Sequence, residues 1–159
     1  MQGPIKWGLI LGTAIAIQTF VFAAAGWHTM YNMAWVWLAI AIALNVAAVV
    51  LCLRETASER TWAGQLQAGL TVGIVASVLV FLSTWVVTGF MFPDYYLEMA
   101  DGYRETLMGM DMSQDEVDQS VAAIAGTSAV RSGVEGVVGT MVVSFVVATV
   151  AGVWIRRKD

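Results

Sequence analysis

Polar side chains inside long apolar stretches are the first residues in this sequence to consider for chemistry. Gln18 and Asn45 lie near the middles of two neighbouring stretches, and no Asp, Glu, Lys, Arg or His lies deep in any of them. An amide in hydrocarbon needs a hydrogen-bond partner, so we expect a Gln18–Asn45 contact. A polar transport site is the alternative. Functional sites inside membranes usually contain ionisable groups. The absence of such groups deep in these stretches therefore argues against a proton relay or an ion-coupled carrier.

The ionisable candidates lie at the ends of these stretches. His28, the single histidine, follows the first stretch and has no second type of metal ligand near it in the sequence. We interpret it as an interfacial turn residue, and a proton-sensing site is the alternative. Arg131 and Glu135 are four residues apart, a spacing that predicts an ion pair on one face of a helix.

The sequence contains none of the common catalytic or cofactor motifs. GxxxxGK[ST], HExxH and GxSxG do not occur, nor does a nucleophile–base arrangement. Cys52 is the single cysteine, so it cannot form an internal disulfide, and no Cys/His spacing suggests zinc or haem. Basic residues are too few to bind nucleic acid. We therefore expect no enzyme activity, no catalytic, cofactor-binding or metal-binding residues, no cofactor and no nucleic-acid partner.

Four apolar stretches, about residues 5–27, 33–53, 65–92 and 133–155, must position whatever side chains act. A helix needs about 20 apolar residues to cross a ~30 Å hydrocarbon core, and each stretch reaches that length. The first is longer than the ~7–15-residue core of a signal peptide, so we expect it to be retained. The sequence predicts an all-α fold, an integral membrane four-helix bundle in a single membrane domain over residues 1–159.

Basic residues favour one orientation of this bundle. Six of the eight Lys and Arg residues fall on the side of the two termini and the second loop, and they are Lys6, Arg54, Arg60, Arg156, Arg157 and Lys158. Arg104 and Arg131 fall on the other side. We expect a multi-pass protein of the inner (cytoplasmic) membrane with both termini in the cytoplasm, where the last three basic residues meet anionic headgroups.

The long loop between the third and fourth stretches, about residues 93–132, is predicted to be helical and extracytoplasmic. Apolar residues at helical spacing predict an amphipathic helix over 94–108, with Tyr95, Tyr96, Met99 and Tyr103 toward the membrane interface or the helix ends. Gly109 ends it, and a capping box over 113–116 starts a second helix that ends near Gly126. We interpret the loop as a cover for the bundle. A partner- or substrate-binding cap and a carboxylate-only cation site at Asp101 and Glu105 are the alternatives.

Small residues at four-residue spacing mark the helix faces that pack against other helices. They are Gly8, Gly12 and Ala16 in the first stretch, Gly69, Gly73 and Ser77 in the third, and Ser132, Gly136, Thr140, Ser144, Ala148 and Gly152 in the fourth. We favour packing within one bundle over packing between protomers.

Several short motifs, in this order, resemble the bacterial four-span membrane family known as domain of unknown function 4199. They are KWGLILG over residues 6–12, an Arg/Glu connector before the Gly-bearing third stretch, Pro-Asp-Tyr over 93–95, Met-Ser-x-x-Glu over 112–116, and a basic end to the last stretch. A Trp-rich first turn and an Ala/Val-rich body depart from the pattern. The resemblance implies a bacterial inner-membrane protein with no assigned activity, and it supplies no catalytic residues.

The sequence favours a non-enzymatic structural or accessory subunit. It would act in the lipid bilayer by packing against a second copy or a membrane-protein partner through the small-residue stripes and the acidic loop. A small transporter or channel that forms its polar path by oligomerising is the alternative.

Overall fold

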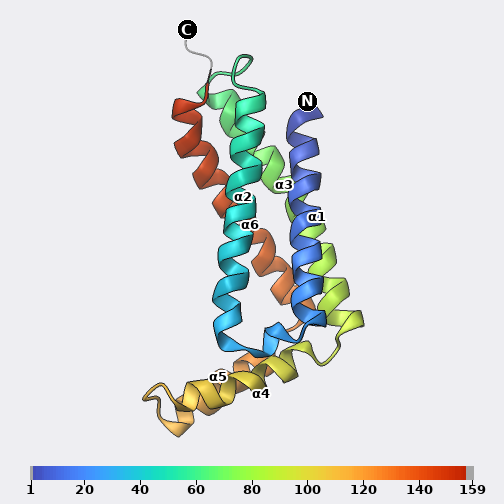
Figure 1. Ribbon diagram of the computed structural model, residues 1–159, viewed down its shortest axis with the longest axis vertical. Helices are drawn as coiled ribbons and strands as arrows, with labels where there is room; N and C mark the ends of the chain where they lie inside the picture. Colours follow the sequence, from blue (N-terminus) through green and yellow to red (C-terminus); the bar gives the residue numbers. More distant parts are fainter. Residues whose placement is uncertain (1, 157–159) are drawn as a thin grey trace.

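The computed structural model describes residues 2–156, which fold into helices and connecting turns without a strand in that range. Four long helices run side by side as a bundle (Figure 1), which confirms the predicted all-α fold. Each is long and apolar enough to cross a membrane. They are α1 (Gln2–Ala24), α2 (Tyr31–Glu55), α3 (Trp62–Val86), which continues through the π-helical turn η2 (Val87–Met91), and α6 (Ala129–Trp154).

The predicted spans agree with these helices to within a few residues, and the first shows why they differ. The first span was expected to reach residue 27, but α1 ends at Ala24. Gly26 then adopts a positive φ of 69°, which glycine reaches without steric cost, and the chain turns there. A single 3-10 turn, η1 (Trp27–Thr29), leads into α2.

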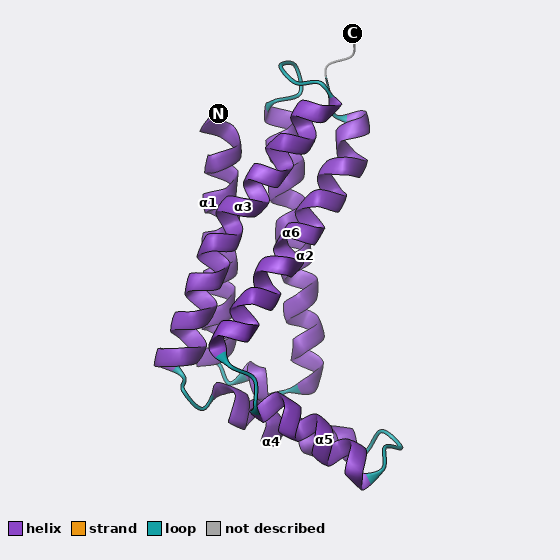
Figure 2. Cartoon of the chain, turned by 180° about the vertical axis from the view of Figure 1, so that it is seen from behind, coloured by secondary structure: helices purple, strands orange, loops and turns teal. Residues whose placement is uncertain are grey.

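Two short helices, α4 (Tyr95–Met108) and α5 (Gln114–Ala125), lie across one end of the bundle and extend past α2 (Figures 1 and 2). We call this the hairpin end, and the opposite end, where both termini lie, the terminal end. Helix α4 matches the predicted range to within one residue, with Gly109 as its C-cap. Helix α5 begins with the predicted capping box, in which the Ser113 hydroxyl accepts from the Glu116 backbone N–H and the Glu116 carboxylate accepts from that of Ser113.

Apolar packing and one ion pair join α4 to α5. Tyr103 and Leu107 of α4 are buried against Val117 and Val121 of α5. Arg104 donates to Asp118 at 2.7 Å, and that hydrogen bond holds the pKa of the Asp118 carboxyl below its usual value.

The small-residue stripes pack helices of one bundle together, as predicted. A Cβ atom added at Gly8 would lie 2.6 Å from Val75 Cβ, and one at Gly12 would lie 2.7 Å from Leu79 Cβ, so both glycines let α1 approach α3 closely. On the other face of α3, a Cβ at Gly73 would lie 2.9 Å from Ser144 Cβ of α6.

The buried and the exposed face of helix α6 also agree with the prediction. Thr140, Ser144, Ala148 and Gly152 are buried, and Ser132 and Gly136 are half-buried. Val142 and Phe145, predicted to meet lipid or the bundle edge, are exposed.

Helix α2 packs tightly over only half of its length. Its buried residues all lie in the half nearer the terminal end, and they are Asn45, Ala48, Val49, Cys52 and Leu53. Toward the hairpin end α6 runs away from α2 and toward α3 (Figures 1 and 2). The core of the bundle is therefore dense at the terminal end and looser at the hairpin end.

Candidate functional site

A cavity of about 390 Å³ occupies the hairpin-end half of the bundle, where α2 and α6 diverge. Residues of all four long helices form its walls, and α4 forms its roof. Most of the lining is apolar, including Ile15 and Phe22 of α1, Val80 of α3 and Val143 of α6. A few polar groups interrupt this surface at two levels. Ligand-binding pockets in proteins likewise combine a mostly apolar lining with a few polar groups.

Contacts between α4 and the η1 turn hold the roof in place. His28 Nε2 lies 3.0 Å from Glu98 Oε2, and the His28 side chain is only 2% exposed. The imidazole stacks on the Tyr95 ring with 4.3 Å between centroids. Gly102 brings the α4 backbone against the Thr29 carbonyl so closely that a Cβ atom would overlap it. His28 is thus the turn residue that the sequence predicts, with a partner 70 residues away that its local sequence does not reveal.

Two phenols of the roof stay un-ionised. Burial raises the pKa of Tyr95 far above its usual value, and it raises that of Tyr103 as well. Tyr103 also packs edge-on against Tyr31 of α2, with 5.2 Å between ring centroids. These rings lie at the helix ends, in agreement with the predicted direction of the apolar face of α4.

A polar network closes the floor of the cavity. Asn45 Nδ2 donates to the Thr140 carbonyl oxygen at 3.2 Å, and Ser144 Oγ donates to Asn45 Oδ1 at 3.0 Å. Below it Val49, Val72 and Ala148 are fully buried, so the terminal-end half is closely packed.

The predicted Gln18–Asn45 contact is wrong. Gln18 Nε2 donates instead to the Trp37 carbonyl oxygen at 2.7 Å. The reason is the antiparallel register of α1 and α2, which places Gln18 level with Trp37, about two helical turns nearer the hairpin end than Asn45. Asn45 turns toward α6, a helix that the sequence gives no reason to choose.

The cavity opens sideways between α2 and α6. Leu38 and Ile42 line it from α2 and are 42% and 41% exposed, and Glu135 and Gly139 line it from α6 and are also exposed. We call the gap between these four residues the portal. Three of the four lie well inside helices that are long and apolar enough to span a membrane.

Two buried polar atoms without partners belong to residues of the roof. Within residues 2–156, four buried side-chain atoms lack a hydrogen-bond partner. His28 Nδ1 and the Tyr96 hydroxyl belong to residues that line the cavity, while Gln18 Oε1 and Arg60 Nε do not. At the floor, Asn45 and Ser144 satisfy each other. An unpaired buried polar group costs about 1–3 kcal/mol, so each of the two unpaired roof atoms carries a cost that is already present in the fold.

Comparison with known proteins identifies the family of this chain. The profile of a family described as "Protein of unknown function (DUF4199)" matches residues 6–157. The chain belongs to the DUF4199 family. No curated protein and no solved structure matches it. The match includes all six α-helices of this DUF4199 protein almost completely, so both the cavity and its roof lie within the family region.

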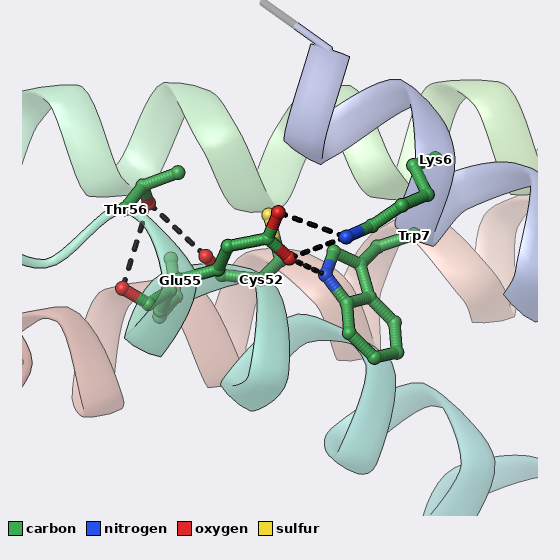
Figure 3. Close-up of polar contacts among 6 residues, drawn as sticks. Lys6, Trp7, Cys52, Glu55 and Thr56 are labelled. Atoms are coloured by element: carbon green, nitrogen blue, oxygen red, sulfur yellow. Dashed lines mark hydrogen bonds and ion pairs between the residues drawn. The ribbon is translucent and has the colours of Figure 1, made fainter.

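A second polar cluster closes the terminal end of the DUF4199 bundle (Figure 3). Lys6 Nζ lies 2.6 Å from Glu55 Oε2, and Trp7 Nε1 donates to the same oxygen at 2.7 Å. Beside it Thr56 Oγ1 lies 3.1 Å from the Cys52 carbonyl oxygen (Figure 3). The same hydroxyl lies 3.0 Å from Gln65 Oε1, and Cys52 is fully buried. These groups satisfy one another, so the cluster ties α1, α2 and α3 together.

The remaining ionisable candidates are paired or dispersed. Arg131 Nε donates to Glu135 Oε1 at 2.9 Å, the predicted ion pair. Within the described part of the chain, no three His, Cys, Asp or Glu side chains come together as metal ligands would. Asp101 and Glu105, the alternative cation site, are therefore not part of such a group. Arg157 and Lys158 of the predicted basic end lie outside the described residues.

Sequence reasoning missed the cavity itself. It selected Gly136 and Thr140 from the regular four-residue stripe of α6, but not Gly139, which lies outside that stripe. A Cβ atom added at Gly139 would meet nothing within 4 Å. No local signal distinguished Gly139, because Gly133 also lies outside the stripe and yet a Cβ atom there would lie 2.8 Å from Phe81 Cδ2.

Proposed function

We propose that this protein binds a lipid-like amphiphile that enters from the bilayer through the portal between α2 and α6. The observation that carries the proposal is the laterally open, mostly apolar cavity between four helices that could span a membrane, roofed by α4. Its volume of about 390 Å³ lies in the ~300–1,000 Å³ range of small-molecule sites. A ligand with a long apolar chain can reach such a site directly from the membrane.

We further propose that the role is binding and not catalysis. The carboxylates around the cavity are already engaged, since Glu98 is paired with His28 and Glu135 with Arg131. A carboxylate that acted as a general base or nucleophile would need to be free within reach of a ligand. This arrangement supports the non-enzymatic accessory role expected from the sequence, exerted through a bound lipid.

Packing against a partner through the small-residue stripes has less support than lipid binding. Gly8, Gly12 and Gly73 are used for contacts between helices of the same chain, so they are not available to a second protein. An oligomeric transporter or channel would have to form its polar path between protomers, because the terminal-end half of one protomer has a closely packed apolar core.

In the cell, we propose that both termini face the cytoplasm and that the α4–α5 hairpin lies on the other side of the inner membrane. The charges support this orientation. Lys6, Arg54, Arg60 and Arg156 lie at the terminal end, while Arg104 and Arg131 lie at the hairpin end. Basic residues near spans favour the cytoplasmic side.

Photocrosslinking in nanodiscs tests the binding proposal. Three probes share one C18 chain with a diazirine and differ in the head, which is a glycerol ester, a carboxylate or an amine. If the proposal is correct, at least one probe labels the cavity-facing residues of α2 or α6, such as Leu38 or Val143, above other lipid-exposed positions. Unlabelled lipid of the same head should compete with this labelling.

Gly139→Leu is the decisive variant because its side chain would occupy the cavity without a clash at Cβ. We expect cavity labelling to fall at least about tenfold, which corresponds to a loss of about 1.4 kcal/mol of binding free energy. Val138→Phe adds similar bulk to the lipid-facing side of the same helix, where Val138 is 55% exposed, and should leave labelling unchanged. Labelling spread evenly over all exposed positions, and equal in both variants, would refute a lipid site.

A further inference from the structure

The charge of the cavity lining restricts the head group of a lipid ligand. Among the residues that line the cavity there is one carboxylate, Glu135, and neither a lysine nor an arginine. Arg131 lies outside the lining and is bound to Glu135. His28 is the basic side chain at the roof, and Glu98 already contacts one of its two ring nitrogens. A negatively charged head would therefore enter a low-dielectric site without a cation to pair with.

The unpaired atoms of the roof indicate which polar groups would fit. The contact with Glu98 uses Nε2 of His28 and leaves Nδ1 without a partner. A hydroxyl both donates and accepts hydrogen bonds, so it can bond Nδ1 in either tautomer. The Tyr96 hydroxyl can donate, and its oxygen has no partner within residues 2–156. A head that carries a hydroxyl, alone or together with an ester, offers both a donor and an acceptor to these two side chains.

The positions of the satisfied and unsatisfied groups orient the ligand. The polar atoms of the floor, on Asn45 and Ser144, bind each other, so this level offers an apolar chain no unpaired polar group. The two unpaired atoms on lining residues, His28 Nδ1 and the Tyr96 hydroxyl, belong to the roof. A head at the roof and a chain directed toward the floor and the portal therefore keep the apolar chain away from these two atoms. A volume near the lower end of the usual pocket range suits one chain better than two.

We infer that the ligand is an uncharged single-chain lipid whose head carries a hydroxyl, alone or together with an ester, seated beneath α4 beside His28 and Tyr96 with its chain in the portal between α2 and α6. This inference rests on the proposed lipid-binding function and specifies its ligand class. Ionised fatty acids and anionic single-chain phospholipids are excluded by the missing cation, and a cationic amphiphile would have to displace Arg131 from Glu135.

The same three probes test the inference when their relative labelling is compared. Measurements at about pH 9 keep the carboxylate probe ionised in the membrane, where desolvation raises its pKa. We expect the glycerol ester to label the cavity at least about tenfold more strongly than the carboxylate, equivalent to about 1.4 kcal/mol. Glu135→Gln should narrow this ratio by raising carboxylate labelling.

Tyr96→Phe tests the position of the head. It removes an unpaired buried hydroxyl, so we expect the fold to keep its melting temperature while glycerol-ester labelling falls several-fold and carboxylate labelling does not change. Tyr31→Phe removes the same atom outside the cavity lining and serves as the matched control.

The outcomes separate this inference from the binding proposal. Equal labelling by all three heads, or stronger labelling by the carboxylate or the amine, overturns the uncharged head while the lipid site remains. Unchanged glycerol-ester labelling in Tyr96→Phe overturns the placement of the head at the roof. Failure of every probe to label the cavity overturns the binding proposal itself.

Discussion

Adding one methyl group to a glycine should have opposite effects at Gly8 and at Gly139. At Gly8 the new Cβ atom would lie 2.6 Å from Val75 Cβ and 3.0 Å from the Val72 carbonyl oxygen. Neither neighbour can move easily, because the first belongs to a stiff β-branched side chain and the second to the α3 backbone. Helix α1 would have to shift away from α3. At Gly139 the same atom would meet nothing within 4 Å.

The sizes of the two effects follow from these distances. Overpacking of a well-packed contact costs about 1–3 kcal/mol, and we assign Gly8→Ala a loss of this size. Gly139→Ala avoids that cost and gains the helical preference of alanine over glycine, about 0.5–1 kcal/mol in a helix interior. A difference of about 2 kcal/mol between the variants corresponds to about 4–8 °C in melting temperature for a chain of this length.

Intrinsic tryptophan fluorescence during a thermal ramp measures this difference for protein purified in detergent and in nanodiscs. Gly8→Ala should melt below the parent protein, and Gly139→Ala should melt at or above it. Equal melting temperatures for all three proteins would mean that close α1–α3 approach contributes nothing measurable. Destabilisation by Gly139→Ala would contradict the open cavity on this face of α6.

Two further outcomes test the orientation and the hairpin. Reporter fusions after Arg60 and after Gln119 should report opposite sides of the membrane, and equal readouts would contradict the four-span arrangement. Hydrogen bonds from Ser113 and Arg104 lower the pKa values of Glu116 and Asp118 below their ordinary 4.5 and 3.8 in the folded hairpin. The stabilisation that these two carboxylates give to the folded hairpin is therefore complete above their ordinary pKa values and is lost as the pH falls through their lowered pKa values. Hydrogen-exchange protection of α5, corrected for intrinsic exchange, should therefore be lower at about pH 3 than at about pH 6. Unchanged protection would show that these carboxylates do not stabilise the hairpin.

Features that depend on neighbours along one helix were predictable. Span lengths follow from bilayer thickness, the capping box at Ser113 from a four-residue signature, and the Arg131–Glu135 pair from helical spacing. The glycine stripes identified packing faces because only small residues allow helices in lipid to approach closely. The stripes did not indicate which glycines make the closest contacts between helices. Gly136 belongs to the stripe, yet a Cβ there would meet only the end of the Val80 side chain at 3.0 Å, a milder contact than at Gly8.

By itself, then, the sequence determined four apolar helices, an amphipathic hairpin between the last two and the faces that carry small residues. The tertiary structure decided which faces meet. It brought Glu98 to His28, turned Asn45 from Gln18 toward α6, and separated α2 from α6 so that a cavity opens beneath α4. These outcomes depend on the register, rotation and tilt of each helix, which all its neighbours set together through close packing. Composition and spacing within a single helix do not specify the register, rotation and tilt that its neighbours impose.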